Sequence, residues 1–195
     1  MNAIPMNDPR QFQFDLPSNS IPPAPLNEVI HRRAWAAAPL STSPRENPDI
    51  ELIVIHATAG STTDGAVSVM AEGRASFHWA VPGPSEAEHE AFVWACAPET
   101  RAAWHVRNSC CHSAICAGAR RLNHRSLGIE IVNTQRGAPF TEWQITATAE
   151  IIRYARAKYP HLRHVVSHAR LDPVRRTDPG HYFPWTNLME RALSI

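Results

Sequence analysis

The stretch Val166–Gly180 constrains this chain most, because a short apolar run leads directly into a proline-rich loop that carries His168 and Asp178. The Asp-Pro-Gly turn in this loop cannot continue a helix or a central strand. A second apolar run, Leu52–His56, also ends on a histidine. Two imidazoles and one carboxylate from separate elements are the ligand set of a hydrolytic zinc site that keeps one position open for water. We therefore expect a metal-dependent hydrolase.

Two alternatives bear on this ligand set. Asp178 taken alone fits a turn-capping aspartate, and its proximity in sequence to His168 favours the metal ligand instead. His164 and His168 have the spacing of two ligands on one helix face. However, Val165 and Val166 between them favour a strand, in which four residues span ~13 Å, so this pair cannot share one ion.

Length and composition describe an ordinary globular protein. The chain has 195 residues, which favours one domain with a substantial core, and 44% of its residues are hydrophobic. A formal net charge of +1 without a basic block argues against nucleic acid as a partner. No apolar run approaches the ~20 residues that a membrane span needs.

The N-terminal region differs from the rest in its proline content. Nine of the 17 prolines precede Asp49, and residues 1–26 show no sustained apolar period. We therefore predict a Pro-rich arm over residues 1–32, partly extended or disordered, and a folded domain over residues 33–195. Residues 26–35 have room for one or two helical turns.

Beyond residue 50 the pattern alternates between strands and helices. Apolar, β-rich segments predict strands at 51–56, 76–81, 91–95, 126–132 and 164–167. Capping residues followed by apolar periodicity predict helices at 62–71, 141–159 and 185–193, the longest of them capped by Thr141. The fold class is α/β: a single domain whose central mixed β-sheet is flanked by helices, with the zinc site in a groove at the strand ends.

Glu130 and the cysteines leave alternatives open. Glu130 interrupts an apolar strand, where burial would raise its pKa and suit it as a general base; an ion pair with an arginine is the structural alternative. Cys110 or Cys111 has the spacing to form a disulfide with Cys116, and reduced thiols are equally expected.

Several short motifs together resemble one known family, the zinc-dependent N-acetylmuramoyl-L-alanine amidases (amidase type 2, peptidoglycan-recognition-like). The motifs are Ile53–Thr58, Ala103–His105, Asn123 with Ser126–Glu130, Ser167–His168, Thr177–Gly180, and the flanking Arg33–Trp35 and Phe183–Trp185. Their joint order and spacing are specific, and they cover roughly Arg33 to Leu188, which makes residues 33–195 an amidase catalytic domain.

The resemblance implies roles for individual residues. His56, His168 and Asp178 would be the three Zn²⁺ ligands, and Glu130 would be the catalytic carboxylate. Arg176 stands where the family usually carries a lysine. An arginine keeps the positive charge but cannot release its proton, so Arg176 would stabilise an oxyanion and not act as a general acid.

The resemblance also points to one branch of the family. Some members place a catalytic tyrosine where this chain has Phe77, and others use cysteine as the third ligand where this chain has Asp178. Both positions here fit the branch that uses a glutamate, to which the AmpD-type enzymes belong. We expect His78 to be a core histidine.

The expected reaction is hydrolysis of the amide between N-acetylmuramic acid and L-alanine of the stem peptide. Trp104, His105 and Asn123 are expected to bind the substrate in the groove, with a core aromatic as the alternative for Trp104. A non-catalytic peptidoglycan-binding receptor is a second hypothesis, although receptors of this superfamily typically lose a zinc ligand that this chain keeps.

The biological setting stays open between several roles. No Sec-type signal peptide is visible at the N-terminus. The chain would act on the bacterial cell wall as a lytic enzyme, a secreted effector with a secretion or immunity partner, or a phage endolysin; cytoplasmic recycling of anhydro-muropeptides is the alternative. We expect a monomer whose partners are peptidoglycan or muropeptides.

Overall fold

The computed structural model describes residues 8–18, 30–35 and 41–194. Its central element is a mixed seven-stranded sheet. The sheet has the order β1-β9-β4-β8-β5-β6-β2, and β3 and β7 form a separate pair. The strands are β1 Gln13–Asp15, β2 Arg32–Ala34, β3 Thr42–Pro44, β4 Leu52–Ala57, β5 Trp79–Val81, β6 Val93–Ala95, β7 Arg101–Ala103, β8 Ser126–Ile131 and β9 His164–Ser167. The helices are α2 Thr63–Ala71, α3 Glu142–Lys158, α4 His168–Leu171 and α5 Trp185–Leu193, with short 3₁₀ helices at Pro9–Gln11, Cys116–Gly118 and Leu122–Arg125.

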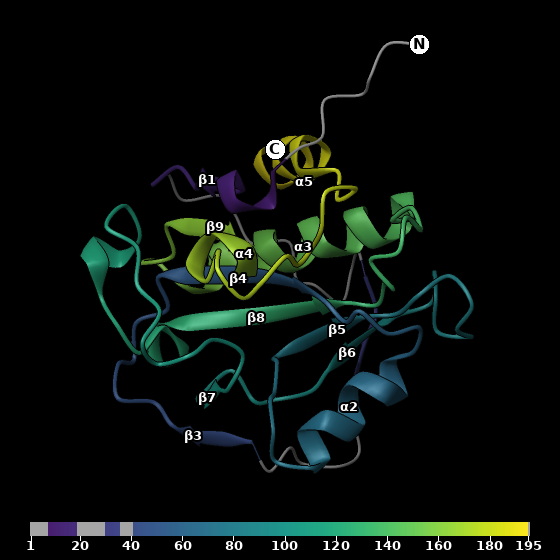
Figure 1. Ribbon diagram of the computed structural model, residues 1–195, viewed down its shortest axis with the longest axis horizontal. Helices are drawn as coiled ribbons and strands as arrows, with labels where there is room; N and C mark the ends of the chain where they lie inside the picture. The colour runs from purple at the N-terminus through teal and green to yellow at the C-terminus, as the bar shows by residue number, and fades with distance from the viewer. Residues whose placement is uncertain (1–7, 19–29, 36–40, 195) are drawn as a thin grey trace.

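The predicted α/β class is confirmed, with helices on both sides of the sheet. Helix α3 lies along one face with α5 beyond it, and α2 lies on the other side beside β5 and β6 (Figure 1). The strands β9, β4, β8 and β5 run parallel to one another, whereas β1 and β6 are antiparallel to their neighbours β9 and β5. Among the described residues, no helix combines the length and the apolar character needed to cross a membrane.

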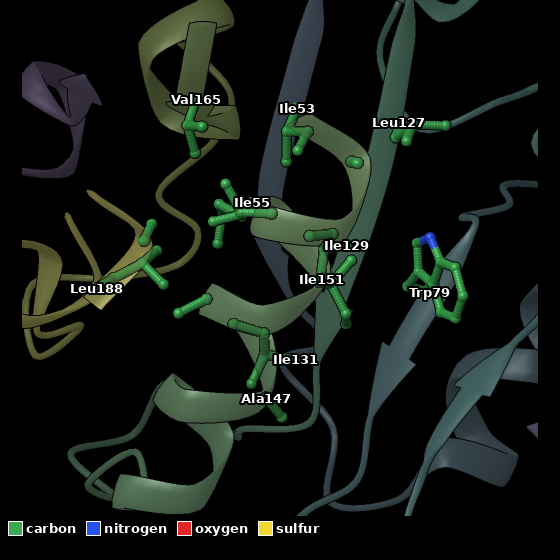
Figure 2. Packing of buried hydrophobic residues seen from close by; sticks show 14 of the residues in the cluster. Ile53, Ile55, Trp79, Leu127, Ile129, Ile131, Ala147, Ile151, Val165 and Leu188 are labelled. Atoms are coloured by element: carbon green, nitrogen blue, oxygen red, sulfur yellow. The ribbon is translucent and has the colours of Figure 1, made fainter. Parts of the chain in front are cut away.

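Side chains alternate between the two faces of the central strands. On one face, isoleucines of β4 and β8 pack against α3; Figure 2 shows Ile53, Ile55 and Ile129 beside Ile151 of that helix. Because side chains alternate with a period of two, His56 and Glu130 lie on the opposite face. The helix α3 begins at the predicted cap, where Thr141 and Gln144 form a capping box.

Two of the predicted elements need correction. The predicted strand at 76–81 begins only at Trp79. The expected helical turns at 26–35 are wrong where that segment is described, because Arg32–Ala34 pairs in parallel with β6 and Arg33 lies over the ring of Phe92. Pairing with a sheet edge therefore overrides the local helix preference; residues 26–29 lie outside the described part.

The N-terminal arm contributes to the core where it is described. Phe12, Phe14 and Leu16 are buried, and β1 adds to the sheet beside β9. We expected no sustained apolar period in residues 1–26. That expectation is wrong for residues 12–16, where buried and less buried side chains alternate as in a strand. Residues 1–7 and 19–29 lie outside the described part, and the division of the chain at residue 33 remains a prediction.

The arm also holds the segment that carries His168. The Ser167 hydroxyl donates to the Pro9 carbonyl over 2.5 Å. Arg170 donates from its guanidinium to the Gln13 side chain and to the Arg10 carbonyl, both over 3.1 Å. His168, the predicted metal ligand, thus directly follows β9, and β1 of the arm pairs with the outer edge of that strand.

All four cysteines are free thiols, which matches the reduced alternative. Cys110 and Cys116 are buried with Leu122 and Leu171 in a small apolar cluster beside β4.

We predict that Phe12→Ala lowers the free energy of unfolding by roughly 3–5 kcal/mol, because it removes a buried ring and leaves a cavity. The ring stacks on Trp185 with centroids 4.9 Å apart and planes at 6°. Urea denaturation followed by far-ultraviolet circular dichroism measures the change. Val174→Ala is the control, since Val174 is 92% exposed and its truncation should change stability by less than ~0.5 kcal/mol. Equal midpoints for Phe12→Ala and the wild type would contradict the packing role of the arm.

Candidate active site

The parallel strands bring three predicted site residues to one edge of the sheet. His56 of β4 and Glu130 of β8 are register partners. Ile55 pairs with Ser167 of β9, so His168, the next residue, lies level with His56 as the first residue of α4. Carboxyl ends of parallel strands are where open α/β sheets place their ligand sites.

The three predicted ligands converge on one point. Nδ1 of His56 lies 3.0 Å from Nδ1 of His168, and Oδ2 of Asp178 lies 3.1 Å from each of these nitrogens. All three residues are buried. Tetrahedral zinc with bonds of 2.0–2.2 Å separates its ligand atoms by ~3.3 Å, so one ion fits above this triangle of donors. The residues present therefore suit a zinc ion in number, type and spacing.

The protonation of these ligands also suits a metal. Burial and the neighbouring His168 lower the pKa of His56 to about 4, which leaves its ring neutral with a free lone pair. Burial alone would raise the pKa of Asp178, but hydrogen bonds with His168 and His56 outweigh it and hold that pKa below its usual value. The triangle thus combines the neutral imidazole of His56 with the carboxylate anion of Asp178, and the His168 ring supplies the third donor atom.

The loop between the ligands is tied to the first of them. The Asp178–Pro179 peptide bond in this loop is cis. The backbone N–H of Ala169 donates to the carbonyl of Asp178 over 3.1 Å, directly beside His168. This hydrogen bond holds the carboxylate of the predicted turn next to the start of α4.

Glu130 lines a cavity of about 490 Å³. The three candidate metal ligands His56, His168 and Asp178 line the same cavity. Burial, and secondly the charge of Asp178, raise the pKa of Glu130 well above the usual value, while Arg176 opposes the shift. No described residue forms a hydrogen bond or ion pair with the Glu130 carboxylate. The alternative of a structural glutamate paired with an arginine is therefore absent from the described residues.

Arg176 lies exposed on the loop between the ligands. It lines the cavity that contains Glu130 and also a second cavity of about 610 Å³, which His168 lines as well. No described residue makes an ion pair with its guanidinium. Its charge therefore faces the groove, where it also acts on the Glu130 carboxylate.

The second cavity is lined by five arginines, a set that the sequence analysis did not anticipate: Arg74, Arg107, Arg121, Arg175 and Arg176. Arg74, Arg121 and Arg175 form ion pairs with Glu72, Glu46 and Asp172, so Arg107 and Arg176 are the two that no described carboxylate pairs. Only Arg175 and Arg176 are neighbours in sequence, so the cluster arises from folding, and local spacing offers no signal for it. Trp104 lines the same cavity and is 43% exposed, which excludes a core aromatic.

His105 and Asn123 line this cavity too, but their polar groups are used inside the protein. The Asn123 side-chain oxygen accepts from the backbone N–H groups of His105 and Val106, and its amide donates to the Val106 carbonyl. His105 places Nδ1 3.1 Å from Nε2 of His56 and Nε2 3.0 Å from the Ser126 hydroxyl. Both residues therefore form part of the cavity wall, and their polar atoms bond to other residues of the protein.

Phe77 and His78 belong to the core beside α2 and β8. Phe77 is 4% exposed and His78 is fully buried. Burial and the nearby Arg45 lower the pKa of His78 to about 3, and its Nδ1 accepts from the backbone N–H of Gly128 over 2.9 Å. The expected core role of His78 matches this environment.

Comparison with known proteins agrees with the fold. Residues 46–181 match the family model described as N-acetylmuramoyl-L-alanine amidase, a span that includes the three candidate ligands, Glu130 and Arg176. N-acetylmuramoyl-L-alanine amidase AmiD of Escherichia coli is 34% identical over 159 residues, which are 75% of this chain and 54% of AmiD. The 1,6-anhydro-N-acetylmuramyl-L-alanine amidase AmpD of Haemophilus influenzae is 33% identical over 79 residues, 40% of each chain.

Solved structures show the same fold. The complex of E. coli AmiD with anhydro-N-acetylmuramic acid-L-Ala-D-gamma-Glu-L-Lys superposes with a TM-score of 0.63 at 32% identity, covering 84% of this chain and 62% of that one. AmpDh3 of Pseudomonas aeruginosa superposes with a TM-score of 0.64 at 24% identity, covering 78% and 64% of the two chains. This chain spans about half the length of the curated AmiD relative. With the matched span, the shared fold and the ligand triangle together, the chain belongs to the N-acetylmuramoyl-L-alanine amidase family.

Proposed function

We propose that this chain is a zinc-dependent amidase that cleaves the bond between N-acetylmuramic acid and L-alanine of the peptidoglycan stem peptide. The observation that carries the proposal is the triangle of His56, His168 and Asp178 donor atoms, 3.0–3.1 Å apart, at the floor of an open groove. A receptor that only binds peptidoglycan has no need of such a complete ligand set.

The metal and Glu130 divide the chemistry between them. Zinc, when bound, polarises the scissile carbonyl and lowers the pKa of a coordinated water to ~7. Glu130 would take the proton of the attacking water and pass it to the leaving amine of L-alanine. Its raised pKa supports this role, because a carboxylate with an ordinary pKa holds a proton too weakly for the second transfer.

Arg176 would stabilise the negative charge that develops on the carbonyl oxygen. Its position between the two cavities supports this role, as does the absence of an ion-pair partner among the described residues. A guanidinium does not release its proton near neutral pH, so the proton for the leaving amine has to come from Glu130.

The arginine-lined cavity supports an anionic peptide as the substrate. Stem peptides carry free carboxylates, and the substrate named with AmiD contains a γ-linked D-Glu. Arg107 and its neighbours would pair with these carboxylates, and Trp104 would pack against the peptide. His105 and Asn123 would shape this part of the groove from behind.

The first test compares substrates. We expect the zinc-loaded protein to release peptides from intact sacculi, as a lytic enzyme, effector or endolysin does, to lose activity on treatment with a chelator, and to regain it when Zn²⁺ is returned. Mass spectrometry of the soluble products identifies the bond that is cleaved. Exclusive cleavage of soluble anhydro-muropeptides would instead favour the recycling role, and binding of sacculi without any cleavage would favour the receptor.

Glu130→Gln is expected to lower kcat by ~10²–10⁴-fold, since it removes the general base while keeping the side-chain shape. Zinc content measured by atomic absorption should stay at the wild-type level, because Glu130 is not in the ligand triangle. Glu190→Gln, a charge change on the exposed side of α5, serves as the control and should leave kcat unchanged. A Glu130→Gln variant with wild-type kcat would overturn the assignment of the base.

Arg176→Ala is expected to lower kcat by ~10²–10³-fold, the usual cost of losing one oxyanion-stabilising group, whereas Arg176→Lys should keep most of the activity. Steady-state kinetics on a purified muropeptide measure both. Arg136→Ala, an exposed arginine outside both cavities, is the matched control. If Arg176→Ala and Arg136→Ala behaved alike, Arg176 would have no part in the reaction.

A further inference from the structure

A second buried histidine, His105, lies beside His56 on the side of its ring that faces away from the triangle of metal-ligand candidates. His56 directs Nδ1 toward the triangle and Nε2 toward Nδ1 of His105, 3.1 Å away. The two rings stand at 90° with centroids 5.2 Å apart. The second nitrogen of His105 lies 3.0 Å from the hydroxyl of Ser126, the first residue of β8. Both ring nitrogens of His105 therefore have a partner inside the protein.

A metal bound at the triangle would fix the direction of the hydrogen bonds that join His56, His105 and Ser126. A nitrogen that binds a metal gives its lone pair, so neutral His56 carries its proton on Nε2 and donates it to His105. Nδ1 of His105 must then accept, which puts the proton of a neutral His105 on Nε2, where it donates to Ser126.

The surroundings of His105 hold its ring in this orientation. A Cβ on Gly128 would lie 2.8 Å from Cγ of His105, so the ring occupies the space that the missing side chain leaves above β8. Asn123 accepts from the His105 backbone N–H, and His78 stands edge-on with ring centroids 5.9 Å apart. The ring is thus fixed from the strand, from the loop and from the core.

We propose that His105 is a positioning residue for the zinc site, which fixes the tautomer and ring angle of His56 by accepting a hydrogen bond from its Nε2. The inference rests on the proposed function only in assuming that the triangle binds zinc. It differs from the predicted role of His105 in substrate binding, because neither ring nitrogen is left for a ligand. His105 is not a fourth metal ligand either, since it faces the nitrogen of His56 that points away from the triangle.

The test compares His105→Phe, which keeps a ring but removes the acceptor, with His105→Asn, whose side-chain oxygen can stand near the position of Nδ1. Zinc affinity is measured on the purified protein by competition with a chromophoric chelator, and the geometry of the site by the visible absorption of the Co²⁺-substituted protein. We expect ~10–100-fold weaker zinc binding and an altered cobalt spectrum for His105→Phe, with most of the affinity restored in His105→Asn. His161→Phe, at an exposed histidine outside both cavities, should bind zinc as the wild type does.

Circular dichroism and the Tm of the metal-free variants separate positioning from folding. If His105→Phe is folded and binds zinc as tightly as the wild type, the positioning role is wrong while the proposed function stands. If the wild type binds no zinc, both are wrong.

If His105→Phe fails to fold, long-range ¹⁵N NMR of the wild-type zinc protein decides, since it reports which ring nitrogen carries the proton. Protons on Nε2 of both His56 and His105 are the expected result. A proton on Nδ1 of His105 would overturn the proposal.

Discussion

The parallel register of β9, β4 and β8 is the constraint on which the site depends. It sets His56 opposite Glu130 and brings His168 level with both, so three residues distant in sequence meet without any loop having to place them. Isoleucines on the other face lock that register against α3, because a slip by one residue would turn His56 into the core and an isoleucine into the groove. Packing on one face of the sheet thereby sets the chemistry on the other.

Burial then gives each titratable group a different state. It keeps His56 neutral, and it raises the pKa of Glu130, which no described residue pairs. Asp178 is equally enclosed, yet its hydrogen bonds with the two histidines hold it ionised. Burial thus leaves His56 neutral and favours a proton on Glu130, whereas Asp178 stays ionised. The hydrogen-bond partners of each group decide the difference.

Much of the fold could be predicted from the sequence, because β4, β8, α3 and α5 carry long, regular apolar patterns. The grouping of His56, His168 and Asp178 could also be predicted, since histidines at the ends of apolar strands and an aspartate in a rigid turn together indicate a metal site. The three-residue strands β2, β3 and β7 were not, because pairing with distant partners decides them. The contact between His105 and His56 and the arginine-lined cavity were missed for the same reason: both exist only through tertiary contacts.

The hydrogen bond from Ser167 to Pro9 joins residues 158 positions apart. During synthesis, the arm therefore leaves the ribosome long before β9, the strand that it covers. Until the C-terminal part of the chain follows, the side chains of Phe12 and Phe14 lack Trp185, against which both rings pack. The sheet edge beside His168 closes only after β9 has been made. His56, His168 and Asp178 therefore come together late in synthesis, when β9 pairs with the earliest described segment of the chain.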